Sequence, residues 1–384
     1  MKTSAERILT THVGSLPRPD DLLALLSARE DGVAVDMQEF EAVSARAVAD
    51  IVARQVDCGV DIVNDGEMAK ISYATYLKDR VDGFGGTAGK SPAARDLLDY
   101  IGYARQLVER GGTEKTLAGV ACDGPLSRRG DDLALQADLA HFIAACESSG
   151  PHDRFLTAAS PGVVSLFLQN QYYPSQDAYL EALAAVLRPE YEAIAATGSV
   201  LQLDCPDLAM GRHILHADKS TDDFRKVAAR HIEVLNAATS NIPPEQMRIH
   251  LCWGNYEGPH HHDIPVADIL DLVYGARPQA ISVEGANPRH EHEWEVFQEK
   301  PLPDDKLIVP GVIDSTSNFI EHPRLVAQRV ERYAGVVGRE RVIASSDCGF
   351  GTFAKRPPVY PDIVWAKLRS LVEGAAIASE RMWR

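Results

Sequence analysis

The chain has 384 residues, of which 45% are hydrophobic and 24% charged, enough apolar material for one large domain or two ordinary ones. With 39 basic against 55 acidic residues its formal net charge is -16, which disfavours binding to nucleic-acid phosphates or to anionic membranes. No apolar run approaches the roughly 20 residues that span a bilayer, residues 1–7 lack a signal-peptide core, and the six cysteines form no short-spaced framework, so we expect a cytoplasmic protein without disulfides.

Apolar, β-branched runs alternate with amphipathic helical patterns, which is typical of a parallel sheet covered by helices. We predict principal strands at residues 8–15, 60–65, 154–159, 200–204, 247–252, 280–284, 307–312 and 342–346. Helices are predicted at residues 40–58, 177–197, 221–240, 323–337 and 362–382. This order predicts an α/β fold, a (β/α)8 TIM barrel that spans residues 1–384 as a single domain. A doubly wound open sheet fits less well, because no glycine-rich phosphate loop follows the first strand.

The regular alternation breaks after the second predicted strand. Residues 66–153 form the longest gap between barrel strands and contain Tyr73, Tyr76 and Phe84, a glycine turn at residues 83–86 and a further strand-like run at residues 116–122. We interpret this region as an elaboration of the barrel, either a lid over one end or an insertion that packs on its side.

Polar side chains gather where the predicted strands end, which is where TIM barrels place their working residues. They are Ser15, Glu67, Asp204, His250, Cys252, Glu284, Asp314, Asp347 and Cys348. Any one of them has a structural explanation, since an aspartate can cap the next helix and a histidine can be a hydrogen-bonded core residue.

Four of these residues together are more specific. His250 and Cys252 are two positions apart, so on a strand they point to the same face. Glu284 and Cys348 end two other strands on the same rim, and two thiols, an imidazole and a carboxylate are a zinc ligand set. Zinc with so negative a ligand shell activates water poorly but can keep an incoming thiol as a nucleophilic thiolate. The hard carboxylate of Glu284 is the ligand that an incoming sulfur should displace most readily.

These motifs resemble the catalytic (C-terminal) domain family of cobalamin-independent methionine synthase, which includes single-barrel relatives such as epoxyalkane:coenzyme M transferase. The resemblance runs from residues 10–17 to residues 346–349 and includes His250-Leu-Cys252, Ser282-Val-Glu284 and Asp347-Cys-Gly349. It implies that the zinc ligands are His250, Cys252, Glu284 and Cys348. It also implies that the amino acid part of homocysteine is held by Ser15, Glu67 and Asp204, two carboxylates being suited to an ammonium group.

The chain departs from the family pattern in two places. The family has a histidine two residues after the aspartate that corresponds to Asp314, proposed to protonate the departing folate nitrogen, but this chain has Thr316 there. A threonine is no proton donor near neutral pH, so the loop histidines His260, His261 and His262 are alternatives, or else solvated loop residues. The N-terminal barrel of the full-length enzymes has no counterpart in 384 residues.

The function that this resemblance implies is zinc-dependent transfer of a methyl or alkyl group to a thiol. The leading version is methyl transfer from a methyltetrahydrofolate-type donor to homocysteine, in methionine biosynthesis. The alternative is addition of a small thiol such as coenzyme M to an epoxide or another alkyl electrophile. Two other readings are a metal-free decarboxylase on the same barrel and a protein that only stores metal or binds thiols. We expect the partners to be a small-molecule thiol and a methyl or alkyl donor, and the sequence leaves a homo-oligomer as an open alternative.

Overall fold

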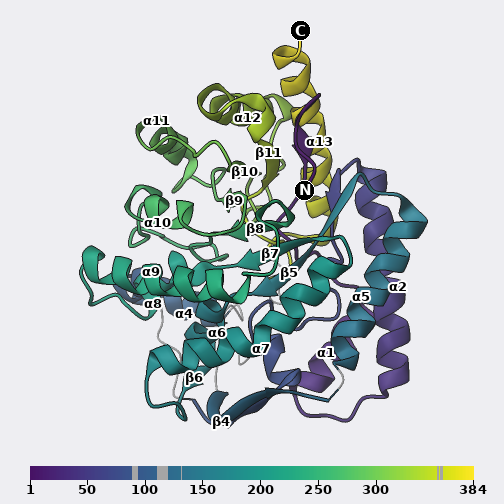
Figure 1. Cartoon of the computed structure of the whole chain (residues 1–384). Helices are drawn as coiled ribbons and strands as arrows, with labels where there is room; N and C mark the ends of the chain where they lie inside the picture. The colour runs from purple at the N-terminus through teal and green to yellow at the C-terminus, as the bar shows by residue number, and fades with distance from the viewer. Residues whose placement is uncertain (89–93, 110–119, 131, 353, 355–357) are drawn as a thin grey trace.

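The computed structural model describes residues 1–88, 94–109, 120–130, 132–352, 354 and 358–384 (Figure 1). Eight parallel strands form one sheet in the order β1-β11-β10-β9-β8-β7-β5-β2. Their bounds are β1 (Leu9–Thr10), β2 (Ile62–Val63), β5 (Asp153–Ala159), β7 (Val200–Asp204), β8 (Met247–His250), β9 (Ala280–Val283), β10 (Leu307–Ile313) and β11 (Ile343–Ser346). Each lies within or beside one of the predicted strands.

The two ends of this sheet meet. The Asp61 amide donates to the Thr10 carbonyl (3.2 Å), and the Thr11 hydroxyl donates to the Ile62 carbonyl (3.0 Å), so β1 and β2 lie next to each other. The sheet therefore curls into a nearly closed parallel barrel, and the prediction of a (β/α)8 TIM barrel is confirmed.

Helices surround the strands on the outside, as Figure 1 shows. The longer ones are α1 (Asp20–Glu30), α2 (Met37–Cys58), α5 (Leu133–Ser149), α7 (Gln176–Ala196), α9 (Thr221–Ala238), α12 (Pro323–Val337) and α13 (Pro361–Met382). The starts of α7 and α9 follow from the sequence, because Ser175 and Ser220 each cap a helix by accepting a hydrogen bond from the amide three residues on. Among the described residues, no helix has both the length and the apolar character needed to cross a bilayer.

The interior of the barrel changes character along its axis. At the N-terminal ends of the strands, apolar side chains such as Leu9, Ile62 and Phe155 form a small buried cluster. Above it the buried guanidinium of Arg248 lies over the Phe155 ring (3.5 Å) and donates to the Gln202 side chain (2.7 Å). It also donates to the Thr11 hydroxyl (3.1 Å) and the carbonyl of residue 12 (2.7 Å). This polar layer separates the apolar base from the rim where the strands end.

The elaboration after β2 has its own small sheet. It contains β3 (Val81–Gly86), β4 (Ala121–Arg128), α3 (Arg95–Asp99), α4 (Ile101–Glu109) and α5. In the small sheet β4 is central, pairing with β3 on one side and with β6 (Gln169–Asn170) on the other. Helix α5 packs on α2 beside the barrel.

Two predictions inside the elaboration need correction or restriction. The turn predicted at residues 83–86 is wrong, because these residues belong to β3. Gly83 has a φ of 98°, and a Cβ there would lie 2.8 Å from the Pro125 carbonyl oxygen, so the glycine permits close pairing with β4. Of the strand predicted at residues 116–122, residues 116–119 lie outside the described residues, and β4 begins at Ala121.

Replacing Arg248 by methionine keeps the apolar stem but removes the hydrogen bonds of the polar layer. Because their acceptors stay buried, we expect the free energy of unfolding, measured by urea titration, to fall by about 3 kcal/mol. Arg332→Met is the matched control, at a side chain that is 41% exposed, and should change it by less than about 0.5 kcal/mol. Equal effects of the two substitutions would contradict a structural role for the polar layer.

Candidate metal and substrate site

Three of the predicted metal ligands converge at the mouth of the barrel. His250 ends β8, Cys252 follows it, and Cys348 follows β11, and one potential ligand atom from each lies within 4.8 Å of the other two. The two Sγ atoms are 3.7 Å apart. That is far longer than a disulfide bond of about 2.05 Å. It matches the roughly 3.75 Å between two sulfurs that are each about 2.3 Å from one tetrahedral ion.

The imidazole of His250 has an unusual environment. Its side chain is buried, yet neither ring nitrogen has a hydrogen-bond partner among the described residues. Burial, and after it the nearby Arg248 charge, lowers the pKa of His250 to about 3, so the ring is neutral and carries a free lone pair. A buried polar atom without a partner costs about 1–3 kcal/mol unless something binds it. A metal ion between His250 and the two thiols would remove that cost.

Glu284 lies beside this group but outside the trio of ligand atoms. Its Oε1 accepts the Trp253 amide (2.9 Å) and its Oε2 accepts the Asn287 side chain (2.8 Å). Burial, and after it the neighbouring Cys252, raises the pKa of Glu284 well above its usual value. A cation at the trio would offset both effects, so the carboxylate is placed to respond to a metal.

Asp347, next to Cys348, holds the turn that follows Glu284. Its carboxylate accepts the amides of Gly285, Ala286 and Asn287, each at 2.8 Å. Burial, and after it Asp314, raises the pKa of Asp347 to about 6, while these amides lower it. The ends of β9 and β11 are therefore fixed to each other through one side chain.

A second group of acids lies deeper in the mouth. Glu67 adopts a left-handed φ of 55°, a conformation that costs about 1–3 kcal/mol. Its Oε1 accepts the Thr157 hydroxyl (3.0 Å), but its buried Oε2 has no hydrogen-bond partner within the part of the chain that the structure describes. Asp204 accepts the Gln202 side chain (2.7 Å), and burial, followed by the charge of Glu67, raises the pKa of Asp204 to about 8. Two buried carboxylates that repel each other form a site suited to a cation.

Ser15 connects this acidic group to the metal trio. Its hydroxyl accepts the Gly351 amide (3.3 Å) and its carbonyl accepts the Phe350 amide (2.8 Å). A Cβ on Gly349 would lie 2.1 Å from the Ser15 hydroxyl oxygen, so the glycine after Cys348 is what allows the two loops to approach.

Asp314 is on the same rim but faces its own loop. Its Oδ1 accepts both the amide and the hydroxyl of Thr316 (2.9 Å each). The following Ser315 hydroxyl donates to the Asn255 side chain (3.0 Å), and Asn255 donates to the Gly349 carbonyl (2.7 Å). Asn255, which the sequence analysis did not single out, thus links the loops after β8, β10 and β11.

Tyr73 is another residue that sequence reasoning left without a role. Its pKa is raised far above the usual value by burial and then by Cys252, Cys348 and Asp204, so the phenol lies close to both groups. Its ring packs edge-on against Phe167 (6.0 Å between centroids). An aromatic side chain from the elaboration therefore enters the candidate site.

The loop histidines have specific partners. His260 bonds the Asp263 carboxylate (2.8 Å) and the Tyr256 carbonyl (3.0 Å), whereas His261 and His262 both face Asp99. The segment at residues 289–293, which follows Glu284 and its turn, reaches into the interior. His290 and Glu293 are buried, and the His290 ring lies 4.4 Å from the Trp253 ring, behind Cys252.

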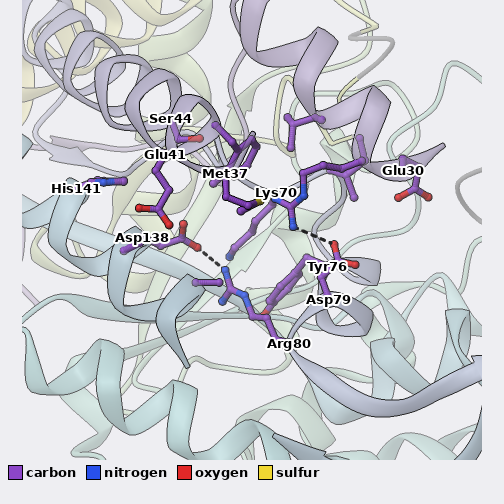
Figure 2. Close-up of a pocket in the computed structure, with 17 residues that line it drawn as sticks. Glu30, Met37, Glu41, Ser44, Lys70, Tyr76, Asp79, Arg80, Asp138 and His141 are labelled. Atoms are coloured by element: carbon purple, nitrogen blue, oxygen red, sulfur yellow. Dashed lines mark hydrogen bonds and ion pairs between the residues drawn. The ribbon is translucent and has the colours of Figure 1, made fainter. Parts of the chain in front are cut away.

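A separate, small pocket of about 80 Å³ opens between α1, α2, α5 and residues 69–71 (Figure 2). Figure 2 shows the Arg80 guanidinium turned toward the Asp138 carboxylate, with which it forms an ion pair. None of His250, Cys252 and Cys348 lines this pocket. Lys70 lies in its wall and donates to the Thr157 carbonyl (2.7 Å), so the pocket backs onto the Glu67 group.

Known proteins resemble this chain along its length. The family model described as "Cobalamin-independent synthase, Catalytic domain" matches residues 167–376. A methionine synthase from Thermococcus kodakarensis is 23% identical over 384 residues, covering 98% of this chain and 94% of that protein. A 5-methyltetrahydropteroyltriglutamate–homocysteine methyltransferase from Nitratidesulfovibrio vulgaris is 24% identical over 346 residues, covering 89% of this chain and 39% of that protein.

Among solved structures, a B12-independent methionine synthase from Shewanella sp. W3-18-1, in complex with selenomethionine, superposes with a TM-score of 0.73. It is 18% identical and the match covers 98% of this chain and 99% of that one, so the likeness extends over the whole barrel and its elaboration.

Asp347→Asn should loosen the turn that carries Glu284, because an amide presents hydrogens to two of the amides that the carboxylate accepts. We expect the free energy of unfolding to fall by about 2 kcal/mol. We also expect a divalent ion, measured by competition with a chelator, to bind about 10–100-fold more weakly. Asp304→Asn, at a fully exposed side chain, is the control and should change neither. Unchanged metal affinity in Asp347→Asn would show that this turn does not contribute to metal binding.

Proposed function

This chain belongs to the family of cobalamin-independent methionine synthase catalytic domains, and from that membership we propose that it is a zinc-dependent methyltransferase that methylates the thiol of homocysteine. The donor that we propose is of the methyltetrahydrofolate type. The reaction forms the sulfur–methyl bond as the nitrogen–methyl bond of the donor breaks, and the freed nitrogen takes up a proton.

One observation carries the proposal of zinc. A buried imidazole without hydrogen-bond partners faces two thiols whose sulfurs are 3.7 Å apart. Hydrogen bonding within the described residues does not explain the arrangement, whereas a borderline-soft ion with nitrogen and sulfur ligands does. The residues that would hold the ion are His250, Cys252, Cys348 and, as a fourth ligand, Glu284.

A zinc ion held there would supply one thing, the stabilisation of an ionised thiol at neutral pH. The role of Glu284 follows from its own contacts. The Trp253 amide and the Asn287 side chain already bind its two oxygens, so the carboxylate keeps two partners whether or not it ligates an ion. We infer that Glu284 can withdraw when the substrate sulfur arrives without being left as a bare buried charge.

The acidic group supports an amino acid as the thiol substrate. Glu67 and Asp204 are buried, and Glu67 Oε2 has no hydrogen-bond partner among the described residues. An ammonium group would therefore give both carboxylates a hydrogen-bond donor and a counter-charge. Ser15 lies against Gly349, next to Cys348, and the following Leu16 amide bonds the Gly66 carbonyl next to Glu67 (3.1 Å), so Ser15 joins the loops that carry the two groups. The same two carboxylates would repel the sulfonate of coenzyme M, which has no ammonium. Homocysteine therefore fits better than the alternative thiol.

The histidine that the family pattern proposes as proton donor to the departing nitrogen is replaced by Thr316 in this chain. The Thr316 hydroxyl donates to Asp314, and His260 is bonded to Asp263 and to the Tyr256 carbonyl. Tyr73, on the elaboration, has its pKa raised by burial and then by the charges of Cys252, Cys348 and Asp204. We infer that Tyr73 helps to enclose the substrates and exclude water, because burial strengthens the electrostatic contacts on which the transfer depends.

The decisive test is methionine formation from homocysteine and methyltetrahydrofolate, at high enzyme concentration, with polyglutamylated donor as a second arm. Methionine formation that stops on zinc removal and returns on zinc addition supports the proposal. Turnover of coenzyme M with an epoxide, without methionine formation, would replace it by the alternative.

Metal analysis of the purified protein should find about one zinc per chain, with zinc–sulfur distances of about 2.3 Å by X-ray absorption. Adding homocysteine should add a further sulfur to the zinc shell. Cys252→Ser and Cys348→Ser should each lower zinc content and abolish activity, because each removes a soft ligand. Cys58→Ser, at a half-buried cysteine on α2, is the control and should retain both. Full zinc content in Cys252→Ser would rule out this site.

The pH dependence of amino acid binding tests the acidic group without involving a thiol. Methionine carries the same ammonium, and Asp204, with its pKa raised to about 8, must lose its proton to bind it as a carboxylate. The Kd of methionine should therefore fall about tenfold between about pH 6 and about pH 9, the contribution of one charge-assisted hydrogen bond. Asp204→Asn should remove this dependence, and Glu67→Gln should move it to lower pH. A flat profile in the unmodified protein would exclude Asp204 from the ammonium site.

A further inference from the structure

A second group of metal-binding side chains lies outside the mouth of the barrel. The Nε2 atoms of His261 and His262 lie 3.0 Å and 2.6 Å from the same carboxylate oxygen of Asp99. The three potential ligand atoms are all within 4.8 Å of one another. We propose that Asp99, His261 and His262 form a second, solvent-accessible site for a first-row divalent cation such as Zn²⁺ or Co²⁺. The proposal uses none of the residues assigned to the thiol site.

The geometry that two hydrogen bonds produce also places three potential ligand atoms around one point. Two imidazoles share one acceptor oxygen, and their rings are close, with centroids 4.2 Å apart. A metal ion would replace the two N–H hydrogens and use the nitrogen lone pairs instead. Two imidazoles and one carboxylate, with further positions open to water, are a common ligand set for such ions.

Charge and exposure agree with this assignment. Asp99 offers a carboxylate oxygen that faces both imidazoles. The side chains of His261 and His262 are each 36% exposed and that of Asp99 is 44% exposed. An ion can therefore enter from solvent and keep water in its open positions.

The two segments that supply these ligands are already held together. Asp96, on α3 with Asp99, accepts the Tyr256 hydroxyl (2.6 Å) and the amide of residue 260 (2.9 Å). The ring of Tyr100, at the end of α3, packs edge-on against His261 (5.5 Å between centroids). Helix α3 and the loop are thus held together before an ion binds, so binding costs little further conformational entropy, and this raises the affinity of the site.

The location links the second site to the elaboration. Residues 254–263 leave the barrel directly after Cys252, whose Sγ accepts the Gly254 amide (3.3 Å), and they end beside Asp99 of α3. An ion at Asp99 would therefore fasten the elaboration to the loop that follows one of the two thiols.

Titration with Co²⁺ of protein that carries one equivalent of Zn²⁺ tests the site directly. Two thiols and an imidazole bind zinc more tightly than two exposed imidazoles and a carboxylate, so the thiol site is then already filled while the second site is free. The unmodified chain should bind about one further Co²⁺ per chain, without the intense absorption of cobalt–thiolate bonds. The double variant H261A/H262A should lose this binding. The control His292→Ala, at an exposed histidine that lies in neither metal-binding group, should retain it. Failure of the unmodified chain to bind further Co²⁺, or equal binding by the double variant, would overturn the proposal.

Two further measurements keep the outcome independent of folding and of the proposed activity. C252S/C348S should still bind Co²⁺ at the second site, so that this site is tested even if the thiol site is wrong. Hydrogen exchange in residues 95–109 and 254–263 should slow on addition of Co²⁺ to the unmodified protein but not to H261A/H262A. Unchanged hydrogen-exchange rates in the unmodified protein would contradict the proposal that the ion holds these two segments together.

Discussion

The distance between the sulfurs of Cys252 and Cys348 is the constraint around which the mouth of the barrel is organised. The two cysteines follow β8 and β11, which are separated in the sheet by β9 and β10. Residues that leave these strands must therefore turn inward across the mouth. Asp347, next to Cys348, is held to the loop after β9 because its carboxylate accepts three amides of that loop. Asn255, in the loop after Cys252, is bonded to the loops after β10 and β11. The separation of the sulfurs is thus supported by contacts of the residues around the cysteines, to which the Gly254 amide adds one hydrogen bond to Cys252 Sγ.

Excess negative charge explains why the same mouth suits two different cations. The trio of His250 and the two thiols lies next to Glu284, and Glu67 and Asp204 lie deeper, while the buried Arg248 is bonded to barrel groups below the rim. Burial raises the pKa of both Glu284 and Asp204, so each carboxylate is stabilised by a cation brought from outside. A metal ion satisfies the first group and an ammonium the second. In the proposed function, the substrate then lies between the two groups, with its sulfur at one and its nitrogen at the other.

The sequence predicts the barrel well because the relevant information is local. Each strand is a short apolar run, and each candidate residue follows such a run, so its place on the rim is known before the strand order is. Other features depend on contacts between distant segments. The two hydrogen bonds of Glu284 involve Trp253 and Asn287, and the approach of Tyr73 to the thiols depends on how the elaboration folds. Gly83 was read as part of a turn because glycine permits a turn, whereas here it permits close strand pairing. Hydrophobic periodicity carries no information on any of these.

The loop after Cys252 shows how the thiol site and the elaboration are mechanically joined. Its first residues bond Glu284, Cys252 and the Gly349 carbonyl, and its later residues bond Asp96 and Asp99 of α3. Behind it the buried His290 ring lies against Trp253 and bonds Asp263, which also binds His260. A displacement of α3 must therefore either break these bonds or move the backbone beside Cys252. Since the elaboration also supplies Tyr73, its position and the geometry of the thiol site cannot vary independently.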